Sequence, residues 1–362
     1  MFTRRSGRRA LATVASLLAL SLVAAACGGD DGEEAATTTK APTTTTTTEA
    51  PTTTTTTAPP TMQLTGLPVA DDLAALRTAM IVKIDNNNSN ARPQRGINTA
   101  DVVIEEAVEG NESRFFAVFH TTLTDPVGPV RSSRTSDIDL MPMFGRPTFS
   151  SSGGNGGTMG AIRAANVAVV AGHDSAYGSY FFRMSNDGDI RRRAPHNLFT
   201  NLTELCSAAC GEGSPPPPFS TFLTQGETRG ATALPVGGVD ITFGNNPVRW
   251  RWDVYANGFL REQRGTPHVD ADGTQVAAEN VVLLMTPYGQ SPFDHRSPEA
   301  KSVGSGEAWV MAGGSVTHGT WVRESPERPY TLTDDEGNII PLTPGQTWLE
   351  LLRTDKPIPT FF

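Results

Sequence analysis

A run of threonine and proline limits how much of this chain can fold. Threonine dominates residues 37–61, and prolines interrupt the run at positions 42, 51, 59 and 60. Such a composition offers almost nothing to bury, and it favours extended backbone. We therefore expect residues 27–62 to form a disordered stalk. About 300 residues follow it, which is enough for two ordinary domains or one large one.

The N-terminus has the pattern of an export signal. An apolar segment from Ala10 to Ala26 follows four arginines, and it is too short and too rich in small residues to be a good spanning helix. The sequence Ala-Ala-Ala-Cys-Gly at 24–28 resembles the lipobox of bacterial lipoproteins, although alanine stands at the first of these positions, where that pattern prefers leucine. In that pattern the signal, here residues 1–26, is removed, and the cysteine thiol carries a diacylglyceryl group.

We therefore expect Cys27 to anchor the mature chain on the extracytoplasmic face of a bacterial cell membrane. Two acyl chains on one cysteine hold a protein on a membrane durably, whereas one chain binds only marginally. The alternative is an ordinary secreted protein with a chance cysteine at the cleavage site.

The charge of the mature chain argues against nucleic acid as a partner. Removal of the four arginines of the signal leaves 25 Lys and Arg against 38 Asp and Glu, a formal charge of −13. An acidic surface repels phosphate backbones. Localised basic clusters still allow an anionic cell-wall component, a lipid-linked ligand or another envelope protein as a partner.

After lipidation two cysteines are left, Cys206 and Cys210. An even pair in an oxidising compartment predicts a small local disulfide. A redox-active pair would be expected as C-x-x-C in a thioredoxin-like unit, and a zinc site would need a matching ligand pair nearby. We expect a structural bridge.

Short apolar runs bounded by Asn, Gly and Pro predict strands in the first half of the folded part. They cover residues 80–84, 102–104 and 115–120, and Phe149 closes a further strand before a glycine-rich loop. Residues 158–165 predict a helix. Strands with intervening helices favour an α/β-type N-terminal domain with a mixed sheet.

Beyond residue 238 the pattern changes to strands alone. Residues 239–243, 248–255 and 258–262 alternate apolar and polar side chains with period two, as half-buried strands do. Residues 281–285 are continuously apolar and predict a buried strand.

The predicted fold class is therefore α+β, with the α/β-type domain over residues 63–210 and a β-rich C-terminal domain over residues 239–362. Residues 211–238, which are rich in proline and glycine, predict a linker or an insertion between them.

Ordered motifs along nearly the whole folded part resemble those of the YerB-like lipoproteins. The matching stretches are residues 64–69, 90–97, 100–103, 109–110, 113–115, 127–134, 195–200, 267–270, 304–308 and 343–348. That family has an N-terminal and a C-terminal domain, both of no established function, so the resemblance implies a two-domain surface lipoprotein and no reaction. One departure is the segment Glu-Gly-Asn-Glu-Ser at 109–113, which replaces a neutral glycine-rich turn and adds a negative charge next to the arginine-bearing segment 128–134.

That segment, the arginine loop, is the best candidate for a binding site. Glycine and proline fix a tight turn, and Arg131 and Arg134, with Ser132 between them, can converge as planar forks on phosphate or carboxylate oxygens. The alternative is a structural role, in which these arginines pair with acidic residues such as Glu105 and hold them to the core.

The glycine-rich loop at 153–157 and a histidine complete the predicted anion site. Backbone N–H groups at Gly154 and Gly156, at a helix start, would favour an anion, although neither a Walker nor a dinucleotide-binding pattern is present. His196 and Asn197 follow three consecutive arginines. The histidine orients a ligand in this interpretation, and otherwise only hydrogen-bonds the backbone.

A distant similarity of layout to the LytR-CpsA-Psr phosphotransferases gives an alternative function. In that family arginines clamp a lipid pyrophosphate and acids bind a metal, which implies comparable roles for Asp85, Asp101, Arg131 and Arg134. The chain has no G-x-S-x-G elbow, and it has no free thiol if the disulfide forms. We expect a binding or scaffolding module for an anionic envelope ligand or partner rather than an enzyme acting on lipid-linked cell-wall precursors.

The sequence predicts no cofactor and no metal site. His268 with Asp270, and Asp294 with His295, have spacings that could begin a metal site, but such a site needs three or four converging ligands. Asp85 follows a predicted strand, where an aspartate more often caps the next turn than binds a metal.

Overall fold

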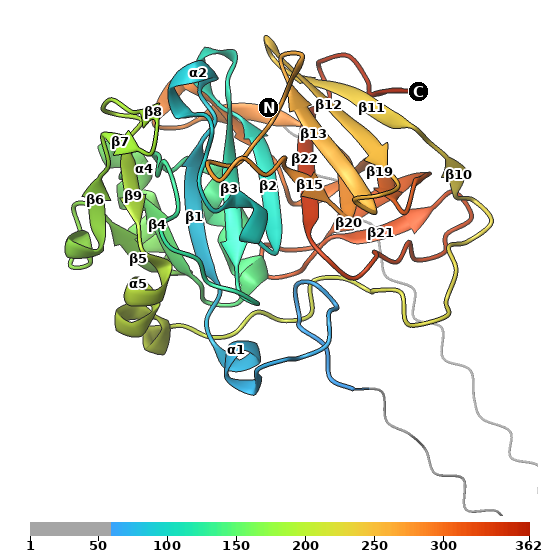
Figure 1. Cartoon of the computed structure of the whole chain (residues 1–362), viewed down its shortest axis with the longest axis horizontal. Helices are drawn as coiled ribbons and strands as arrows, with labels where there is room; N and C mark the ends of the chain where they lie inside the picture. Colours follow the sequence, from blue (N-terminus) through green and yellow to red (C-terminus); the bar gives the residue numbers. More distant parts are fainter. Residues whose placement is uncertain (1–58) are drawn as a thin grey trace, which may run out of the picture. The chain divides into compact units, whose positions relative to one another are not determined.

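In the computed structural model, which describes residues 59–362, one mixed sheet of eleven strands runs through most of the chain (Figure 1). Its strands, in order across the sheet, are β10 (Leu234–Pro235), β20 (Ser315–Arg323), β19 (Gly304–Ala312), β16 (Asn280–Thr286), β22 (Thr347–Arg353), β2 (Val102–Ala107), β3 (Ser113–Phe119), β1 (Met80–Asp85), β4 (Thr148–Ser151) and β5 (Val169–Gly172), with β21 (Thr331–Asp334) paired to β20.

The predicted signal, Cys27 and nearly all of the predicted stalk lie outside the described residues. Among the helices from residue 59 onward, none is long and apolar enough to cross a membrane.

Strands from both halves of the chain pair directly at β22. Trp348 on this strand lies in register with Val281 on β16 and with Val103 on β2, and both pairings are parallel. The strands predicted at residues 102–104 and 115–120 and the buried strand predicted at residues 281–285 are confirmed as β2, β3 and β16, and every residue of the three is buried. The two halves therefore share one hydrogen-bonded sheet.

A second sheet of six strands covers part of the first. It contains β14 (Thr266–Pro267), β13 (Gly258–Gln263), β12 (Asn246–Asp253), β11 (Gly238–Phe243) and β23 (Thr360–Phe361), with β15 (Ala277–Ala278) paired to β13. Trp250 on β12 meets Trp348 edge to face, with ring centroids 5.1 Å apart. The period-two alternation predicted for β12 is confirmed by its alternately buried and exposed residues from Asn246 to Arg251.

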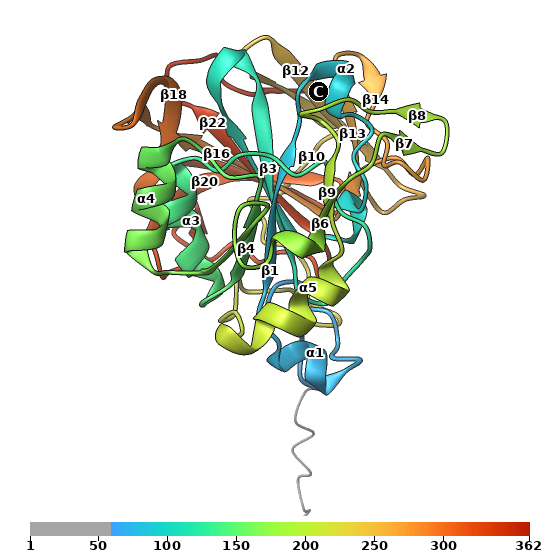
Figure 2. The ribbon, with the colours of Figure 1, turned by 90° about the vertical axis from the view of Figure 1, so that its left-hand side faces the viewer.

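Short helices lie around the large sheet, with α3 and α4 on one side of it and α5 and α1 toward its lower end in the view of Figure 2. They are α1 (Asp72–Leu76), α2 (Asn88–Ala91), α3 (Ser136–Leu140), α4 (Gly156–Ala165) and α5 (Leu202–Ala209), with 3-10 turns η1 (Ile97–Thr99), η2 (Glu109–Asn111), η3 (Met141–Phe144), η4 (Gly178–Tyr180) and η5 (Cys210–Glu212).

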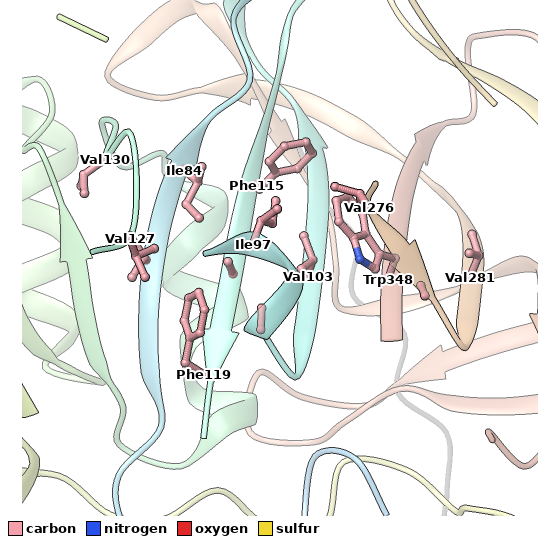
Figure 3. Close-up of a cluster of buried hydrophobic side chains, with 14 of the residues drawn as sticks. Ile84, Ile97, Val103, Phe115, Phe119, Val127, Val130, Val276, Val281 and Trp348 are labelled. Atoms are coloured by element: carbon pink, nitrogen blue, oxygen red, sulfur yellow. The ribbon is translucent and has the colours of Figure 1, made fainter. Parts of the chain in front are cut away.

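The large sheet separates two apolar clusters. Val82 and Ile84 pack in one cluster with α5 and the six-stranded sheet, whereas Ile81 packs in the other with α3 and α4. Figure 3 shows part of the first cluster, in which Phe115 from β3 and Trp348 from β22 lie on the same side of the sheet. The predicted α+β class is confirmed, with a mixed sheet in the N-terminal region and antiparallel pairing over most of the β-rich C-terminal region.

Three two-stranded sheets complete the fold: β17 (Tyr288–Ser291) with β18 (Asp294–Ala300), β6 (Phe181–Arg183) with β9 (Leu198–Thr200), and β7 (Asn186–Asp187) with β8 (Ile190–Arg191). Cys206 and Cys210 form a disulfide at the end of α5, as the cysteine count predicts. Within the predicted linker, Phe219 is buried and stacks on Phe144, with ring centroids 6.0 Å apart.

A network of three charges is buried on the α3 and α4 face of the sheet. Lys83 on β1 forms ion pairs with Glu106 on β2 and with Asp137 on α3, the latter with Nζ 2.7 Å from Oδ1. All three side chains are fully buried. Burial raises the pKa of the Asp137 carboxyl, and Glu106 adds to this effect while Lys83 opposes it.

A second buried network joins the two halves on the opposite face. Arg261 donates to Glu105 Oε2 at 2.6 Å and to His268 Nδ1 at 2.7 Å, and His268 Nε2 donates to Gln94 Oε1 at 2.7 Å. Because Nδ1 accepts from a guanidinium, His268 is neutral. Burial, followed by the charge of Arg261, holds the pKa of His268 well below its usual value.

Glu350 extends this second network from β22. It lies in register with Glu105 on β2, and it accepts a hydrogen bond from Trp250 Nε1 at 2.8 Å. Burial, followed by the charge of Glu105, raises the pKa of Glu350 well above its usual value. The folded chain therefore favours the protonated form of the Glu350 carboxyl more than the unfolded chain does.

Candidate functional site

The arginine loop lies at the carboxyl ends of parallel strands. β1, β4 and β5 run parallel, but β4 pairs with β1 only along residues 80–82. Beyond that point the arginine loop takes the place of β4, because Arg131 N donates to Lys83 O at 2.7 Å and Asp85 N donates to Pro129 O at 2.9 Å. Crevices outside the carboxyl ends of such strands are common ligand sites in α/β sheets.

Asp85, Arg131 and His196 meet at this edge and form what we call the Asp85 cluster. Asp85 is the last residue of β1 and is 2 % exposed. Its Oδ2 lies 2.6 Å from His196 Nδ1 and 3.1 Å from Arg131 Nε, while its Oδ1 accepts the backbone N–H of Asn87 at 3.1 Å. One buried carboxylate therefore orients two cation-forming side chains and also caps the following turn.

Donor groups of the Asp85 cluster are left without protein partners in the described part of the chain. Arg131 Nε lies close to Asp85 without hydrogen-bond geometry, and neither Nη1 nor Nη2 of Arg131 donates to any group in residues 59–362. His196 Nε2 likewise makes no hydrogen bond there, since the ring bonds only through Nδ1. Both side chains are partly exposed, at 23 % and 14 %, so these donors can meet a ligand.

Arg134 is placed differently from Arg131 because Glu109 binds it. Arg134 Nε donates to Glu109 Oε2 at 2.9 Å, Nη2 donates to Oε1, and Nη1 donates to Ser133 O at 2.7 Å. Arg114 also pairs with Glu109, at 3.2 Å. Burial opposes ionisation of Glu109, but the charges of Arg114 and Arg134 outweigh it and lower its pKa. The acidic departure seen in the sequence thus neutralises one of the two predicted anion-binding arginines.

The buried Arg114 guanidinium lies behind the arginine loop. It donates to Ser132 O at 2.8 Å, and burial, followed by the nearby Arg134 charge, lowers its pKa to about 10. The Ser132 hydroxyl lies 3.4 Å from the Ser152 hydroxyl. Neither Arg114 nor Ser132 extends the set of unpartnered donors.

The glycine-rich loop lies beside the arginine loop but lines its own pocket. Ser152 N donates to Arg131 O at 3.0 Å and Ser133 N donates to Gly153 O at 2.8 Å, which joins the two loops. Gly154 and Gly156 line a pocket of about 320 Å³ with Arg163 and Asp174. No residue of the arginine loop lines that pocket. The residues predicted to form one anion site therefore lie in two separate places.

Asn197 also lies outside the cluster of free donors. It is 4 % exposed, and its Oδ1 accepts a hydrogen bond from Arg183 Nη1 at 2.8 Å. Its role in the structure is to hold the segment that carries His196.

The four residues of the phosphotransferase alternative do not meet at one centre. Asp85 lies opposite Arg114 at the start of β3, whereas Asp101 accepts the backbone N–H groups of His120 and Thr121, just past the end of β3. The length of that strand, about 20 Å, separates the two acids. Burial raises the pKa of Asp101, and its backbone contacts assign it a turn-capping position.

The described residues contain no cluster of three or more His, Cys, Asp or Glu side chains placed to hold a metal ion. His268 is held by Arg261 and Gln94, and Asp270 Oδ2 accepts the backbone N–H of Ile97 at 2.9 Å. Asp294 accepts from the backbone N–H of Arg296 at 3.1 Å.

Sequence reasoning named every member of the Asp85 cluster but did not join Asp85 to His196. These residues are 111 positions apart, and the contact depends on the segment after β8 returning to the end of β1. His196 follows three consecutive arginines, but Asp85 has no arginine beside it in the sequence, so no local signal joins the two residues.

Comparison with known proteins identifies relatives along most of the chain. Residues 64–214 match the family described as “Protein of unknown function (DUF3048) N-terminal domain”, and residues 239–349 match the corresponding C-terminal domain. The chain is 27% identical over 294 residues to “Putative lipoprotein YerB” of Bacillus subtilis, covering 80% of this chain and 85% of the relative.

A solved structure gives the same result for the fold. The crystal structure of the YerB protein from Bacillus subtilis superimposes with a TM-score of 0.71 at 25% identity, covering 83% of this chain and 99% of that one. Two domain matches in the same order, a relative along most of the chain and a shared fold all agree. The chain belongs to the YerB-like family of two-domain proteins of unknown function.

Proposed function

We propose that this protein is a lipid-anchored protein of the bacterial envelope that binds an anionic ligand at the Asp85 cluster. The observation that carries the proposal is the set of unpartnered donors, Arg131 Nη1 and Nη2 and His196 Nε2, beside the carboxylate that orients both side chains. A planar guanidinium with two free nitrogens matches a phosphate or carboxylate group. The ligand class is therefore a phosphate- or carboxylate-bearing envelope component.

The local charge supports an anion although the whole chain is acidic. Arg114, Arg131 and Arg134 face Asp85 and Glu109, which leaves one net positive charge. Because the cluster lies at the carboxyl ends of β1 and β4, a ligand there would contact a rigid sheet edge rather than a loose surface loop.

Anchoring at Cys27 fits the name of the Bacillus subtilis relative and the sequence of the signal. In this proposal the diacylglyceryl group holds the chain on the extracytoplasmic face of the membrane, and the stalk carries the folded part away from it. The phosphotransferase alternative has less support, because Asp101 lies far from Asp85 and Arg134 is bound by Glu109.

Replacing Arg131 with glutamine is expected to weaken binding of inorganic pyrophosphate at least about ten-fold, since charge-assisted hydrogen bonds each contribute about 1.5–3 kcal/mol. Asp85→Asn is expected to strengthen binding, because it removes a negative charge from the site while keeping its shape. Titration calorimetry of the folded part with its stalk measures both.

Arg163→Gln is the matched control, because Arg163 is an exposed arginine that lines the pocket of the glycine-rich loop. It should leave pyrophosphate binding unchanged. If Arg163→Gln weakens binding and Arg131→Gln does not, the Asp85 cluster is not the site. Phosphate release from lipid-linked precursors with magnesium or manganese present, lost in Arg131→Gln, would favour the phosphotransferase alternative instead.

Replacing Cys27 with serine is expected to move the protein from the membrane fraction to the soluble fraction of the cells or to the medium. A serine cannot form the thioether on which the anchor depends, and the apolar segment before it should then be cleaved as an ordinary signal. Fractionation with mass measurement of the N-terminal peptide checks this. An unchanged membrane fraction with a cleaved N-terminus would contradict lipid anchoring at this residue.

A further inference from the structure

A second pocket lies at the other end of the large sheet from the Asp85 cluster. Its volume is about 600 Å³, within the range of small-molecule sites. Its lining comes from β10, β19 and β20 of the large sheet and from β23 of the six-stranded sheet. Four strands separate β19 from β1 in the order of the large sheet, and Figure 1 shows β10 and β20 on the opposite side of the folded part from β1 and β4. The pocket is therefore independent of the site in the proposed function.

Aromatic and aliphatic side chains form the walls of this pocket, which we call the Trp309 pocket. Trp309 lies with its ring centroid 5.9 Å from that of Phe361, and Val236 and Val316 complete the wall beside them. Leu234 and Phe362 also line it and are 64% and 51% exposed. Large apolar side chains gathered around a hollow at the surface are typical of binding sites.

An acidic rim lies along one side of the Trp309 pocket. His318 Nδ1 lies 2.8 Å from Asp335 Oδ2 and its Nε2 lies 3.0 Å from Glu307 Oε1. Two ring nitrogens that both face carboxylates must both donate, so this histidine is an imidazolium, and two carboxylates against one imidazolium leave one net negative charge. The hydrogen bond to Asp335, followed by that to Glu307, raises the pKa of His318 against the effect of burial.

No other cation of the described residues neutralises this rim at close range. Arg249 lies over the Phe362 ring at 4.9 Å, but its guanidinium donates twice to Asp240, at 2.7 Å each. Glu336, the next residue after Asp335, does not line this pocket. The rim therefore attracts a cation, and the walls attract an apolar group.

We propose that the Trp309 pocket binds a small organic ammonium compound whose charged group adjoins an aromatic or other ring-sized apolar group. The ring lies against Trp309 and Phe361, and the ammonium group lies at the rim with Asp335. Aromatic faces stabilise a cation placed over them, and the carboxylate supplies a charge-assisted hydrogen bond. An acid of the same shape is excluded by the negative rim.

The test measures how tightly three compounds of one shape bind to the folded part of the protein with its stalk. These are 2-phenylethylamine, the neutral 2-phenylethanol and the anionic 3-phenylpropionate. Binding is followed by NMR at the indole N–H resonance of Trp309, which is assigned with Trp309→Phe. The amine is expected to bind about two- to five-fold more tightly than the alcohol, and the acid more weakly than either.

Asp335→Asn is expected to weaken amine binding about two- to five-fold and to leave alcohol binding unchanged. Glu336→Gln is the matched control, because it removes the same charge one residue away and outside the pocket lining. Leu234→Lys places a positive charge at an exposed position of the wall, so it should weaken binding of the amine and leave binding of the alcohol unchanged. Equal binding of amine and alcohol, or equal effects of Asp335→Asn and Glu336→Gln, would overturn the proposal, as would a resonance of Trp309 that moves with none of the compounds.

Discussion

Replacing Lys83 with methionine is expected to lower the free energy of unfolding by about 3–5 kcal/mol at neutral pH. Methionine keeps most of the volume of the side chain, but it leaves Glu106 and Asp137 fully buried without their shared cation. Breaking a buried ion pair in this way costs more than the pair itself contributes, because desolvation of the remaining charge is no longer offset. Urea unfolding followed by tryptophan fluorescence measures the change.

The pH dependence of the Lys83→Met effect follows from the carboxyls. The pKa of the Asp137 carboxyl is raised in the folded chain. As the pH rises through the ordinary titration range of a carboxyl, the unfolded chain releases this proton first, so the contribution of Asp137 to the stability of the fold falls. The loss caused by Lys83→Met should therefore be smaller at about pH 4.5 than at about pH 7.5.

A matched variant separates charge from packing. Lys83→Met with Glu106→Gln and Asp137→Asn keeps the shape of the network but removes all its charges. The new amide oxygen at position 137 can still accept the backbone N–H of Arg134, which Asp137 Oδ2 accepts at 2.7 Å. This triple variant should recover most of the stability lost in Lys83→Met. If it is no more stable than the single variant, lost packing and not the uncompensated charge explains the effect.

The strands of this fold could be predicted from the sequence, but their order could not. Continuous apolar runs indicate β2 and β16, and period-two alternation indicates β12, because both patterns depend only on which faces are buried. The insertion of β22 between β16 and β2 has no local signal, because parallel neighbours can come from any distance along the chain.

The same reasoning explains what could be predicted of the candidate site. Arg131 could be singled out because its loop combines a glycine-proline turn with planar, permanently charged side chains. That Arg134 is bound by Glu109, whereas Arg131 keeps unpartnered donors, depends on the positions of η2 and β1 at one sheet edge. The sequence showed an added negative charge near the loop, but not which arginine it would meet.

Replacing Arg261 with methionine is expected to destabilise the protein by about 3–5 kcal/mol at neutral pH, and this change acts where the two halves of the chain meet. Arg261 on β13 is fully buried and is the cation paired with Glu105 on β2. Without it, Glu105 loses its paired cation while it faces Glu350 across adjacent strands, and His268 loses the donor to its Nδ1.

Glu350 makes the sign of the pH dependence testable. Its pKa is raised well above the ordinary value of 4.5, so the folded chain holds this proton at a pH where the unfolded chain has released it. Stability is therefore lost as the pH rises above about 4.5, and Glu350→Gln, which cannot ionise and can still accept from Trp250, should gain stability over the unchanged protein progressively above that pH.

Arg261→Met should make this pH-dependent loss steeper, since Arg261 is the charge that opposes the raised pKa of Glu350. Adding Glu350→Gln to Arg261→Met should then recover part of the lost stability at about pH 8 and little at about pH 4. Urea unfolding of the four proteins across this pH range measures the effect. If Arg261→Met destabilises the protein equally at both ends of the pH range, the charge of Arg261 is not what matters most. Its packing against Phe115 and Trp348, whose ring centroids both lie 5.3 Å from the guanidinium, would then explain the effect.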